Sequence, residues 1–296
     1  MLKLGIIGMN EGNGHPFSYS AMFNGFDPVA LKKRCPFELI KKYLPEEHQN
    51  RNLIGDADVT HIWTQDISLS EDIAAVAKIP NIVTNYEDMI GKVDGIILAR
   101  DDPWNHLEMA RPFLAAQVPI FIDKQLTASK EDLDLLLELS GIDYKLMACS
   151  AMRYTRDVKV AKSRENLANV KSIHGMSRVS WMRYGHHLLE GIVAIWGVDV
   201  NWVRSLSSDK NHDIVQIEYE SGLNVILEFI TDISLPIKFT CFSETGPPFE
   251  VHFQDFYYSF REMMQEFTNM LTTNVVPIPY SEIVSIAKII IAGDLS

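Results

Sequence analysis

The fold of this chain is decided by residues 94–125, which read DGIILARDDPWNHLEMARPFLAAQVPIFIDKQ. The first apolar run, DGIIL, is rich in isoleucine, as is typical of a strand buried on both faces. The middle part, which starts at Asn105, carries apolar side chains at helical spacing, and Asn105 can cap that helix. The second apolar run, VPIFI, ends at Asp123-Lys124-Gln125. The pattern predicts a strand, a helix and a second strand.

Lys124 follows the second of these strands directly. In an open parallel sheet, ligands bind just beyond the carboxyl ends of the strands. Lys124 is therefore a candidate functional residue. A solvated lysine that merely ends a strand is the alternative interpretation, and only its neighbours can decide between the two.

The rest of the first half repeats the alternation of strand and helix. Strands are predicted at residues 2–7, 59–64, 81–84 and 144–149, and helices at 17–23, 70–78 and 129–140, with Ser70 as an N-cap. Strands and helices that alternate at this spacing form a parallel sheet covered on both faces. We therefore predict an α/β Rossmann domain with a doubly wound parallel sheet at residues 1–149.

Residues 27–58 interrupt this pattern with a polar and basic segment. The segment is longer than a connection from a helix to a strand needs to be. We interpret it as an inserted lobe with one or two short helices, for which a lid is one function to consider.

The pattern changes after about residue 150. Strands are predicted at 169–181, 202–206, 213–219, 223–230, 237–242 and 249–253, and helices at 188–196, 256–271 and 281–292. Turn residues such as Glu220-Ser-Gly222 separate neighbouring strands, as hairpins require. We predict a second domain at residues 150–296, of α+β type with an open, mostly antiparallel sheet.

Composition limits the classes of partner. The net charge of −12 argues against nucleic acid and against an anionic membrane surface. Three widely spaced cysteines, Cys35, Cys149 and Cys241, indicate neither a disulfide framework nor a zinc site, and they fit a reducing cytoplasm. No signal peptide and no membrane-spanning run is evident in the sequence. We expect a cytoplasmic protein with a small-molecule substrate.

A glycine-rich loop between the first strand and its helix is the candidate nucleotide site. The loop residues proposed to bind a cofactor are Gly8, Met9, Asn10, Gly12, Asn13 and Gly14. Free N–H groups and the helix dipole converge at such a place. The glycine spacing differs from G-x-G-x-x-G, so a turn that binds nothing is an equal alternative. Asp66, at the end of the second strand, would accept hydrogen bonds from an adenosine ribose and repel a 2′-phosphate, which favours NAD over NADP.

Two further groups of residues could carry chemistry. Tyr184-Gly-His186-His187-Leu-Leu-Glu190 opens a helix of the second domain, and paired histidines can transfer protons near neutral pH. A helix-end feature is the more common role of such a pair, and a metal site would need ligands that do not stand nearby. Arg153 and Tyr154 follow the sixth strand and could grip a hydroxylated substrate or join the domains.

The order of these parts resembles the Gfo/Idh/MocA family of nicotinamide-dependent sugar and cyclitol oxidoreductases. Asp123-Lys124-Gln125 looks like the Glu-Lys-Pro of that family, and residues 94–126 look like the strand, loop and helix that lead into it. Residues 152–154 look like its Arg-Tyr opening of the second domain, and residues 184–190 like its Asp-x-Gly-x-His helix. The resemblance covers nearly the whole chain outside residues 27–58.

The resemblance implies roles for individual residues at an active site between two domains. Lys124 would polarise the reacting oxygen, His187 would donate and accept its proton, and Asp123 would position the nicotinamide ribose. Other residues at the sheet edge implied on the cofactor side are Arg100, Asp101 and His106, although His106 also suits a structural role. Substrate contacts would come from Arg153, Tyr154, Arg183, Tyr184 and His186. The open sheet would form a homodimer or homotetramer.

Three departures from the family pattern stand in the sequence. Arg183 occupies the place of the acidic residue four before the histidine, the glycine spacing is altered, and Gln125 replaces proline. The leading hypothesis is an NAD(P)-dependent dehydrogenase or reductase of a sugar, cyclitol or small polyol, with NAD preferred. The alternative is a catalytically degenerate protein that senses a nucleotide or sugar. A weaker third hypothesis is a metal-assisted hydrolase or lyase that uses His186 and His187.

Overall fold

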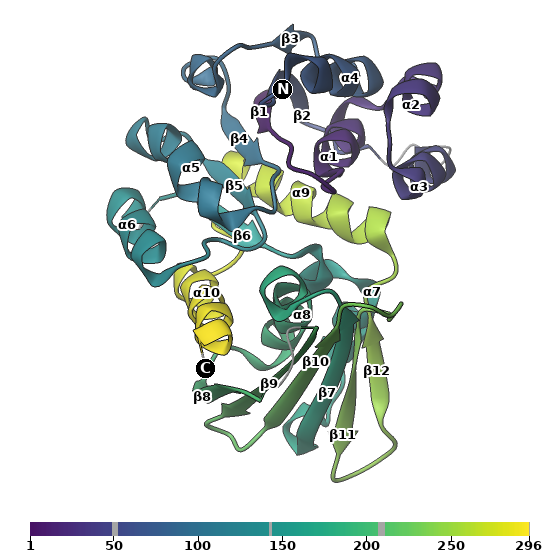
Figure 1. Ribbon diagram of the computed structural model, residues 1–296, viewed down its shortest axis with the longest axis vertical. Coiled ribbons are helices and arrows are strands. Elements are labelled where there is room, and N and C mark those ends of the chain that lie inside the picture. The colour runs from purple at the N-terminus through teal and green to yellow at the C-terminus, as the bar shows by residue number, and fades with distance from the viewer. Residues whose placement is uncertain (49–52, 142–143, 207–210, 296) are drawn as a thin grey trace. The chain divides into compact units, whose positions relative to one another are not determined.

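The computed structural model describes residues 1–48, 53–141, 144–206 and 211–295 (Figure 1). The chain forms two compact units, each with a six-stranded sheet. The first unit consists of residues 1–127, 131–148 and 260–278, and the second of residues 128–130, 149–259 and 279–296. The predicted fold, a Rossmann domain followed by a mostly antiparallel α+β domain, is confirmed.

The first unit is built on a parallel sheet with the strand order β3-β2-β1-β4-β5-β6. Its strands are β1 (Leu2–Ile7), β2 (Ala57–Trp63), β3 (Asn81–Ile82), β4 (Gly95–Leu98), β5 (Ile120–Asp123) and β6 (Leu146–Cys149). All four residues of β4, and all four of β5, are buried, as expected for central strands covered on both faces. The strand order reverses between β1 and β4, and open parallel sheets bind their ligands at the carboxyl edge beside such a reversal.

Helices cover both faces of this sheet. They are α1 (His15–Asn24), α4 (Ile67–Ala77), α5 (His106–Ala115), α6 (Lys130–Ser140) and α9 (Phe256–Thr273), with short turns η1 (Tyr86–Met89) and η2 (Pro103–Asn105). Tyr19 of α1 and Phe267 of α9 both contact the ring of Phe121 on β5, so these two helices share one face of the sheet. Right-handed connections place α5 and α6 on the opposite face (Figure 1).

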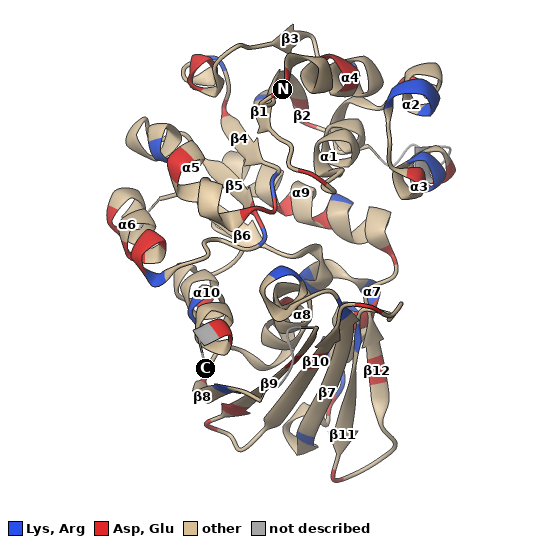
Figure 2. Ribbon diagram, in the orientation of Figure 1, with Lys and Arg blue, Asp and Glu red and all other residues tan. Residues whose placement is uncertain are grey.

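Residues 27–58 contain two helices, α2 (Pro28–Arg34) and α3 (Glu38–His48), as predicted. Helix α3 packs on α1, which helps to bury α1 from Pro16 to Phe23, and α2 packs on α4 and α3. A Tyr43 hydroxyl donates to Ser18 at 2.6 Å. Figure 2 shows the basic residues of this segment gathered on α2 and α3. The described part of the insertion is thus a second helical layer, and the interpretation as a lid gains no support from it; residues 49–52 lie outside the described part.

The predicted N-cap of helix α4 is wrong, and the predicted N-cap of α5 has the expected position but no capping bond. Helix α4 begins at Ile67, because the Asp66 carboxylate accepts from the backbone N–H of Ser68 and caps the helix four residues earlier than expected. Ser70 is buried instead, and its hydroxyl is bonded to Thr64 at 2.8 Å. Asn105 makes no side-chain cap bond, since its amide donates to Asp102.

The second unit is built on a mixed sheet with the strand order β12-β11-β7-β10-β9-β8. Its strands are β7 (Val170–Arg178), β8 (Val200–Ser205), β9 (His212–Tyr219), β10 (Asn224–Ile230), β11 (Lys238–Ser243) and β12 (Phe249–His252). All pairs are antiparallel except β7 with β10, and Gly222 (φ 82°) provides the predicted hairpin turn between β9 and β10.

One face of this second sheet is covered and the other is open. Helix α8 (His186–Trp196) lies over the covered face, where Gly175 leaves room for Leu188 and Gly191 leaves room for Phe239. The remaining elements of the unit are η3 (Ala151–Tyr154), α7 (Arg156–Lys162), η4 (Leu167–Asn169), the π-helical turn Trp181–Gly185 and α10 (Tyr280–Leu295). Met176 and Phe242 point from the open face and are 37% and 39% exposed.

The compact units differ from the predicted division, since residues 128–130 and Cys149 lie in the second unit and a longer segment lies in the first. Residues 260–278, which contain most of α9, were expected in the second domain but belong to the first unit. The reason lies in packing: Gly95 on β4 leaves room for the side chains of Phe267 and Leu271. The first unit therefore needs a helix from near the end of the chain to cover its sheet.

This packing predicts a large effect at Phe267, which is completely buried. Phe267→Ala should lower the free energy of unfolding by about 3–5 kcal/mol, because it removes a ring and leaves a cavity between α9 and the sheet. Leu39→Ala on the exposed side of α3 is the control and should change stability by about 0.5 kcal/mol or less. Chemical denaturation measures both, and equal effects would contradict this account of α9.

Candidate functional site

The glycine loop connects β1 to α1 and is built to keep backbone N–H groups available. Pro16 lies at the start of α1, where its missing N–H costs nothing. Within the described residues, the N–H groups of Gly12 and Gly14 form no hydrogen bond. A Cβ at Gly14 would lie 2.6 Å from the Ile40 side chain of α3, so glycine is required there by the insertion.

Asn13 places a further hydrogen-bond donor in this loop. Its side chain is 3% exposed, and its carbonyl oxygen accepts from the His15 N–H at 2.8 Å. Its amide nitrogen is buried and has no hydrogen-bond partner among the described residues. A buried donor without a partner is costly, and an anion at the N-terminus of α1 would satisfy it. The loop therefore fits a phosphate group despite its altered glycine spacing.

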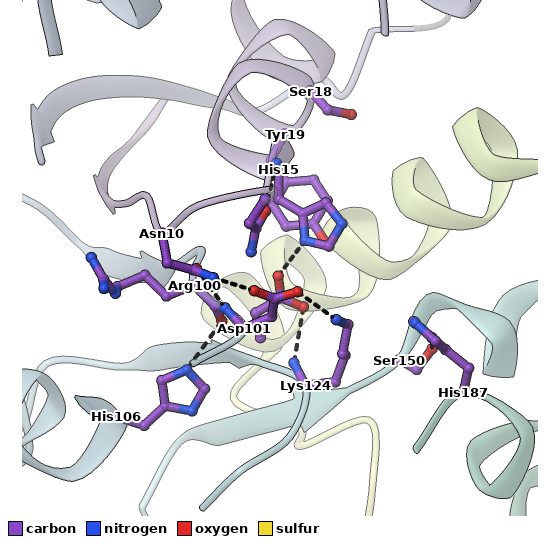
Figure 3. Close-up of polar contacts among 12 residues, drawn as sticks. Asn10, His15, Ser18, Tyr19, Arg100, Asp101, His106, Lys124, Ser150 and His187 are labelled. Atoms are coloured by element: carbon purple, nitrogen blue, oxygen red, sulfur yellow. Dashed lines mark hydrogen bonds and ion pairs between the residues drawn. The ribbon is translucent and has the colours of Figure 1, made fainter. Parts of the chain in front are cut away.

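Lys124 is held in a buried network at the carboxyl edge of the parallel sheet (Figure 3). Its side chain is 7% exposed, and Nζ donates to Oδ2 of Asp101 at 3.0 Å. The other oxygen of Asp101 accepts from the Asn10 amide at 2.5 Å, and Asn10 in turn accepts from the Asp101 N–H. The peptide bond from Lys124 to Gln125 is cis. Lys124, Asp101 and Asn10, predicted separately, are thus brought into contact.

The charges of this network determine the ionisation of Asp101. Burial alone would raise the pKa of the Asp101 carboxyl, but the Lys124 ammonium and the Asn10 amide outweigh it and hold that pKa well below its ordinary range. Asp101 is therefore a carboxylate at neutral pH, and it faces a cation.

Asp123 meets His15 instead of standing free. Its carboxylate is 1% exposed and contacts His15 Nδ1, and it also accepts from the Lys124 N–H at 2.9 Å. The hydroxyl of Tyr19 lies 3.1 Å from the same Nδ1, and the His15 ring stacks on the Tyr19 ring. A carboxylate can only accept, so Nδ1 carries the hydrogen and Nε2 of neutral His15 is an acceptor. With both oxygens of Asp123 engaged, a direct contact with a ribose, as predicted for Asp123, is not supported by its placement.

Arg100 and His106 stabilise the loops of the site through hydrogen bonds to backbone carbonyls. Arg100 is buried, binds Asp102 through two hydrogen bonds and donates to the Met9 carbonyl. Burial opposes the charge of Asp102, but the bonds from Arg100 lower the pKa of that carboxyl. His106 is fully buried, with its ring nitrogens 3.1 and 3.0 Å from the carbonyls of Leu126 and Arg100, and burial lowers its pKa. These contacts suit the structural role that the sequence also allowed for His106, and its cofactor contact stays a prediction.

Asp66 lies at the carboxyl end of β2 as expected. One carboxylate oxygen caps α4 by accepting from the N–H and the hydroxyl of Ser68, both at 2.9 Å. These bonds lower the pKa of Asp66. Its second oxygen makes no hydrogen bond within the described part of the chain, so it remains able to accept from a ligand.

In the second unit, His187 pairs with a serine that the sequence did not single out. Nδ1 of His187 lies 2.6 Å from the hydroxyl oxygen of Ser150, and both side chains are buried. The rings of Tyr184 and Phe253 flank the imidazole at 5.0 and 5.4 Å. Ser150 directly follows β6 and is the N-cap of η3.

Arg153 and His186 belong to a buried ion-pair cluster of the second unit. Arg153 contacts the carboxylates of Glu190 at 2.6 Å and of Glu282, and His186 Nε2 lies 3.1 Å from Glu190. Burial opposes these charges, yet Arg153 lowers the pKa of Glu190 and the two glutamates raise the pKa of Arg153. The substrate contacts predicted for Arg153 and His186 are not supported, since both side chains serve the interior of the unit.

The remaining predicted residues have different surroundings. Arg183 is exposed on the π-helical turn, Tyr184 on the same turn is half-buried, and Tyr154 ends η3 and is half-buried. Among the described residues, no group of three His, Cys, Asp or Glu could hold a metal ion. The three cysteines are buried and free, and within the described chain no helix is long and apolar enough to cross a membrane.

Two residues escaped the sequence-based assignment. His15 directly follows the glycine loop, and this position alone indicates a functional candidate. Its partner Asp123, however, is 108 positions away in the sequence. Ser150 carried no signal, because a single serine after a strand is ordinary. Both are recognisable only when the sheet brings distant loop ends together.

Comparisons with protein-family models and with curated protein sequences give no match. Solved structures match over nearly the whole chain. Myo-inositol 2-dehydrogenase from Lactobacillus plantarum is 15% identical, with a TM-score of 0.72 and coverage of 100% of this chain and 96% of that one. Scyllo-inositol dehydrogenase from Lactobacillus casei, with bound NAD(H) and scyllo-inositol, is 12% identical, with a TM-score of 0.74 and coverage of 99% and 95%.

A UDP-N-acetylglucosamine 3-dehydrogenase from Acidithiobacillus ferrooxidans is 10% identical, with a TM-score of 0.71 and coverage of 99% and 96%. Identities this low establish the architecture and leave the reaction open. The resemblance to the Gfo/Idh/MocA family is thereby confirmed at the level of the fold: this chain has the two-unit fold of the inositol and sugar dehydrogenases.

Proposed function

We propose that this protein is a divergent Gfo/Idh/MocA oxidoreductase that transfers a hydride between NAD and the hydroxyl or carbonyl carbon of a sugar, a cyclitol or a related small polyol. The observation that carries the proposal is the buried Lys124 ammonium at the carboxyl end of β5, paired with Asp101. The fold, and solved neighbours that act on inositols and nucleotide sugars, support it.

In this proposal Lys124 binds the reacting oxygen of the substrate. An ammonium fixed in a site with little water stabilises the negative charge that develops on that oxygen. Asp101 keeps the ammonium in place before the substrate arrives. His187 would hydrogen-bond a substrate oxygen, and Tyr154, Arg183 and Tyr184 are further candidates for substrate contact.

The glycine loop and Asp66 would hold the cofactor. The N–H groups of Gly12 and Gly14 and the amide of Asn13 are donors suited to a pyrophosphate. The free oxygen of Asp66 is suited to a ribose diol. Bound NAD would supply the hydride-accepting carbon, and the protein's part is alignment and proton handling.

Assembly is part of the same proposal. The open face of the second sheet carries Met176, Ile226 and Phe242 among half-exposed neighbours. Exposed apolar side chains on a sheet face are typical of an interface. We expect a homodimer or a homotetramer through this face.

Lys124→Met tests the chemistry. The substitution keeps the length of the side chain but removes the ammonium, so kcat should fall about 100-fold or more while NADH binding changes little. Stopped-flow or steady-state absorbance of NADH, with a substrate found in a polyol and sugar panel, measures this. Lys41→Met, which breaks a surface pair with Glu38, is the control and should leave kcat unchanged. Normal turnover by Lys124→Met would remove this mechanism.

The rival proposal is a sensor that binds a nucleotide or sugar without turnover. It is favoured by Arg183 in the place of the family's acid and by the neutralisation of Lys124 by Asp101. Calorimetry with NAD, NADH and NADP distinguishes the two: binding without turnover across the panel supports the sensor, and no binding contradicts both.

Asp66→Asn tests the cofactor preference. The amide oxygen can still cap α4, but the negative charge that repels a 2′-phosphate is lost. The ratio of the Kd for NADP to the Kd for NAD should fall about tenfold, which corresponds to about 1.4 kcal/mol. Asp58→Asn, an exposed position on β2, is the control and should leave this ratio unchanged. An unchanged ratio in Asp66→Asn would place the ribose elsewhere.

Asp101→Asn tests the pairing with Lys124 through stability. The substitution removes the negative charge that the buried Lys124 ammonium contacts at position 101, and the free energy of unfolding should fall by about 1–3 kcal/mol at pH 7. The folded pKa of Asp101 lies below the ordinary value of 3.8, so the pairing is fully effective above pH 3.8 and is lost as pH falls below it. The deficit of the variant should be equal at pH 7 and pH 5.

Denaturation at several pH values measures that deficit. Asp72→Asn breaks a half-exposed pair with Arg34 and should cost about 1 kcal/mol or less. A deficit in Asp101→Asn that disappears between pH 7 and pH 5 would show that Asp101 is not the low-pKa partner described here.

A further inference from the structure

The hydrogen bonds of Ser150 fix the position of one hydrogen on His187. Ser150 directly follows β6 and caps η3: its hydroxyl oxygen accepts from the Met152 N–H at 3.2 Å. The same oxygen lies 2.6 Å from Nδ1 of His187. Ser150 is 1% exposed, so no solvent reaches the hydroxyl freely.

The hydroxyl has one hydrogen to donate and two lone pairs that accept. Met152 uses one lone pair. Within the described residues, Nδ1 of His187 is the remaining polar partner of this oxygen. If Nδ1 carried a hydrogen, the Ser150 O–H would be buried without an acceptor, which is the costly state. The favourable arrangement has the O–H donating to a bare Nδ1.

We infer that Ser150 holds neutral His187 in the tautomer with its hydrogen on Nε2, which makes His187 a fixed hydrogen-bond donor to ligand oxygen. Ser150 is thus a positioning residue that acts through His187. The tautomer follows from the contacts alone. Its use on a substrate rests on the proposed function.

The chemical class of the ligand atom follows from this tautomer. An Nε2–H group binds an acceptor, such as a carbonyl or carboxylate oxygen, and cannot take a proton from a hydroxyl while Nδ1 remains bare. A carboxylate partner on Nδ1 would impose the opposite tautomer, with Nε2 as a base. Arg183 stands in the position where the resemblance implies such an acid, so this chain has exchanged an accepting partner for a donating one. The inference therefore favours keto compounds as ligands. In their reduction, which rests on the proposed function, NADH would deliver a hydride to the carbonyl carbon and become NAD, and the oxygen would take a proton from the Lys124 ammonium. His187 would donate a hydrogen bond to the ligand without giving up its proton.

His15 provides a comparison inside the same molecule. Its Nδ1 faces the Asp123 carboxylate, which can only accept, so neutral His15 should carry its hydrogen on Nδ1. The two histidines are therefore expected to show opposite tautomers in one spectrum.

Nitrogen-15 NMR of the imidazole groups tests the inference on the full chain, without cofactor or substrate, at a pH where both rings are neutral. Signals are assigned with His187→Gln and His15→Gln. The expected result is an excess of about tenfold of the Nε2–H form at His187 and of the Nδ1–H form at His15. An Nδ1–H form, or an equal mixture, at His187 would overturn the inference.

Variants of Ser150 provide a second test of the His187 tautomer. Ser150→Ala should abolish the preference at His187, and Ser150→Thr, which restores a hydroxyl, should retain it. Thr155→Val removes a comparable capping hydroxyl, the one at the start of α7, and should leave His187 unchanged. A preference that survives in Ser150→Ala contradicts the assignment. If that variant does not fold, the spectrum of the unaltered protein still decides.

The role in catalysis has its own readout, so that the two failures can be told apart. With an active keto substrate, Ser150→Ala should lower kcat/KM for reduction about tenfold, and Ser150→Thr should restore it. Unchanged reduction by Ser150→Ala, together with the expected spectrum, would overturn the donor role and leave the tautomer intact. Absence of turnover in every variant, including the unaltered chain, would contradict the proposed function and the role that rests on it.

Discussion

The candidate site depends on the ion pair between Lys124 and Asp101. A buried ammonium is tolerated only if a carboxylate meets it, and a buried carboxylate is tolerated only if donors surround it. Asp101 satisfies both requirements, because it binds Lys124 with one oxygen and the Asn10 amide with the other. Three separate chain segments are joined in this way: the glycine loop and the loops after β4 and β5. The carboxyl edge of the sheet therefore carries charged groups in fixed positions.

Much of the fold could be predicted from the sequence, because it is written in local patterns. Apolar runs such as those at β1 and β4 are long enough, and regular enough, to identify buried strands. The helix caps were less predictable, since Asp66 and Ser70 are both good caps and only the buried contact of Ser70 with Thr64 decides between them. The place of α9 could not be predicted, because its partner strands are far away in the sequence.

The sequence predicted which residues lie at the carboxyl edge of the sheet, but it did not predict which side chains contact one another there. Lys124, Asp101 and Asn10 each follow a predicted strand and were therefore expected at the carboxyl edge, and the structure brings their side chains into contact. The sequence contains nothing that pairs His15 with Asp123 or His187 with Ser150. These pairs arise from loops that converge in space, and they determine which histidine nitrogen can donate and which can accept. His106 illustrates the reverse case, in which a plausible position turned out to be fully buried.

The late position of α9 in the chain has a consequence for synthesis on the ribosome. Phe260 of α9 contacts His15 and Tyr19, near the beginning of the chain. Domains generally fold from the N-terminus as they emerge. Here α1 covers only part of one face of the first sheet, and the part that α9 covers stays open until more than a hundred residues of the second unit have been made. The nascent protein therefore passes through a stage at which it presents apolar surface to the cell, and chaperone binding is the natural protection at that stage.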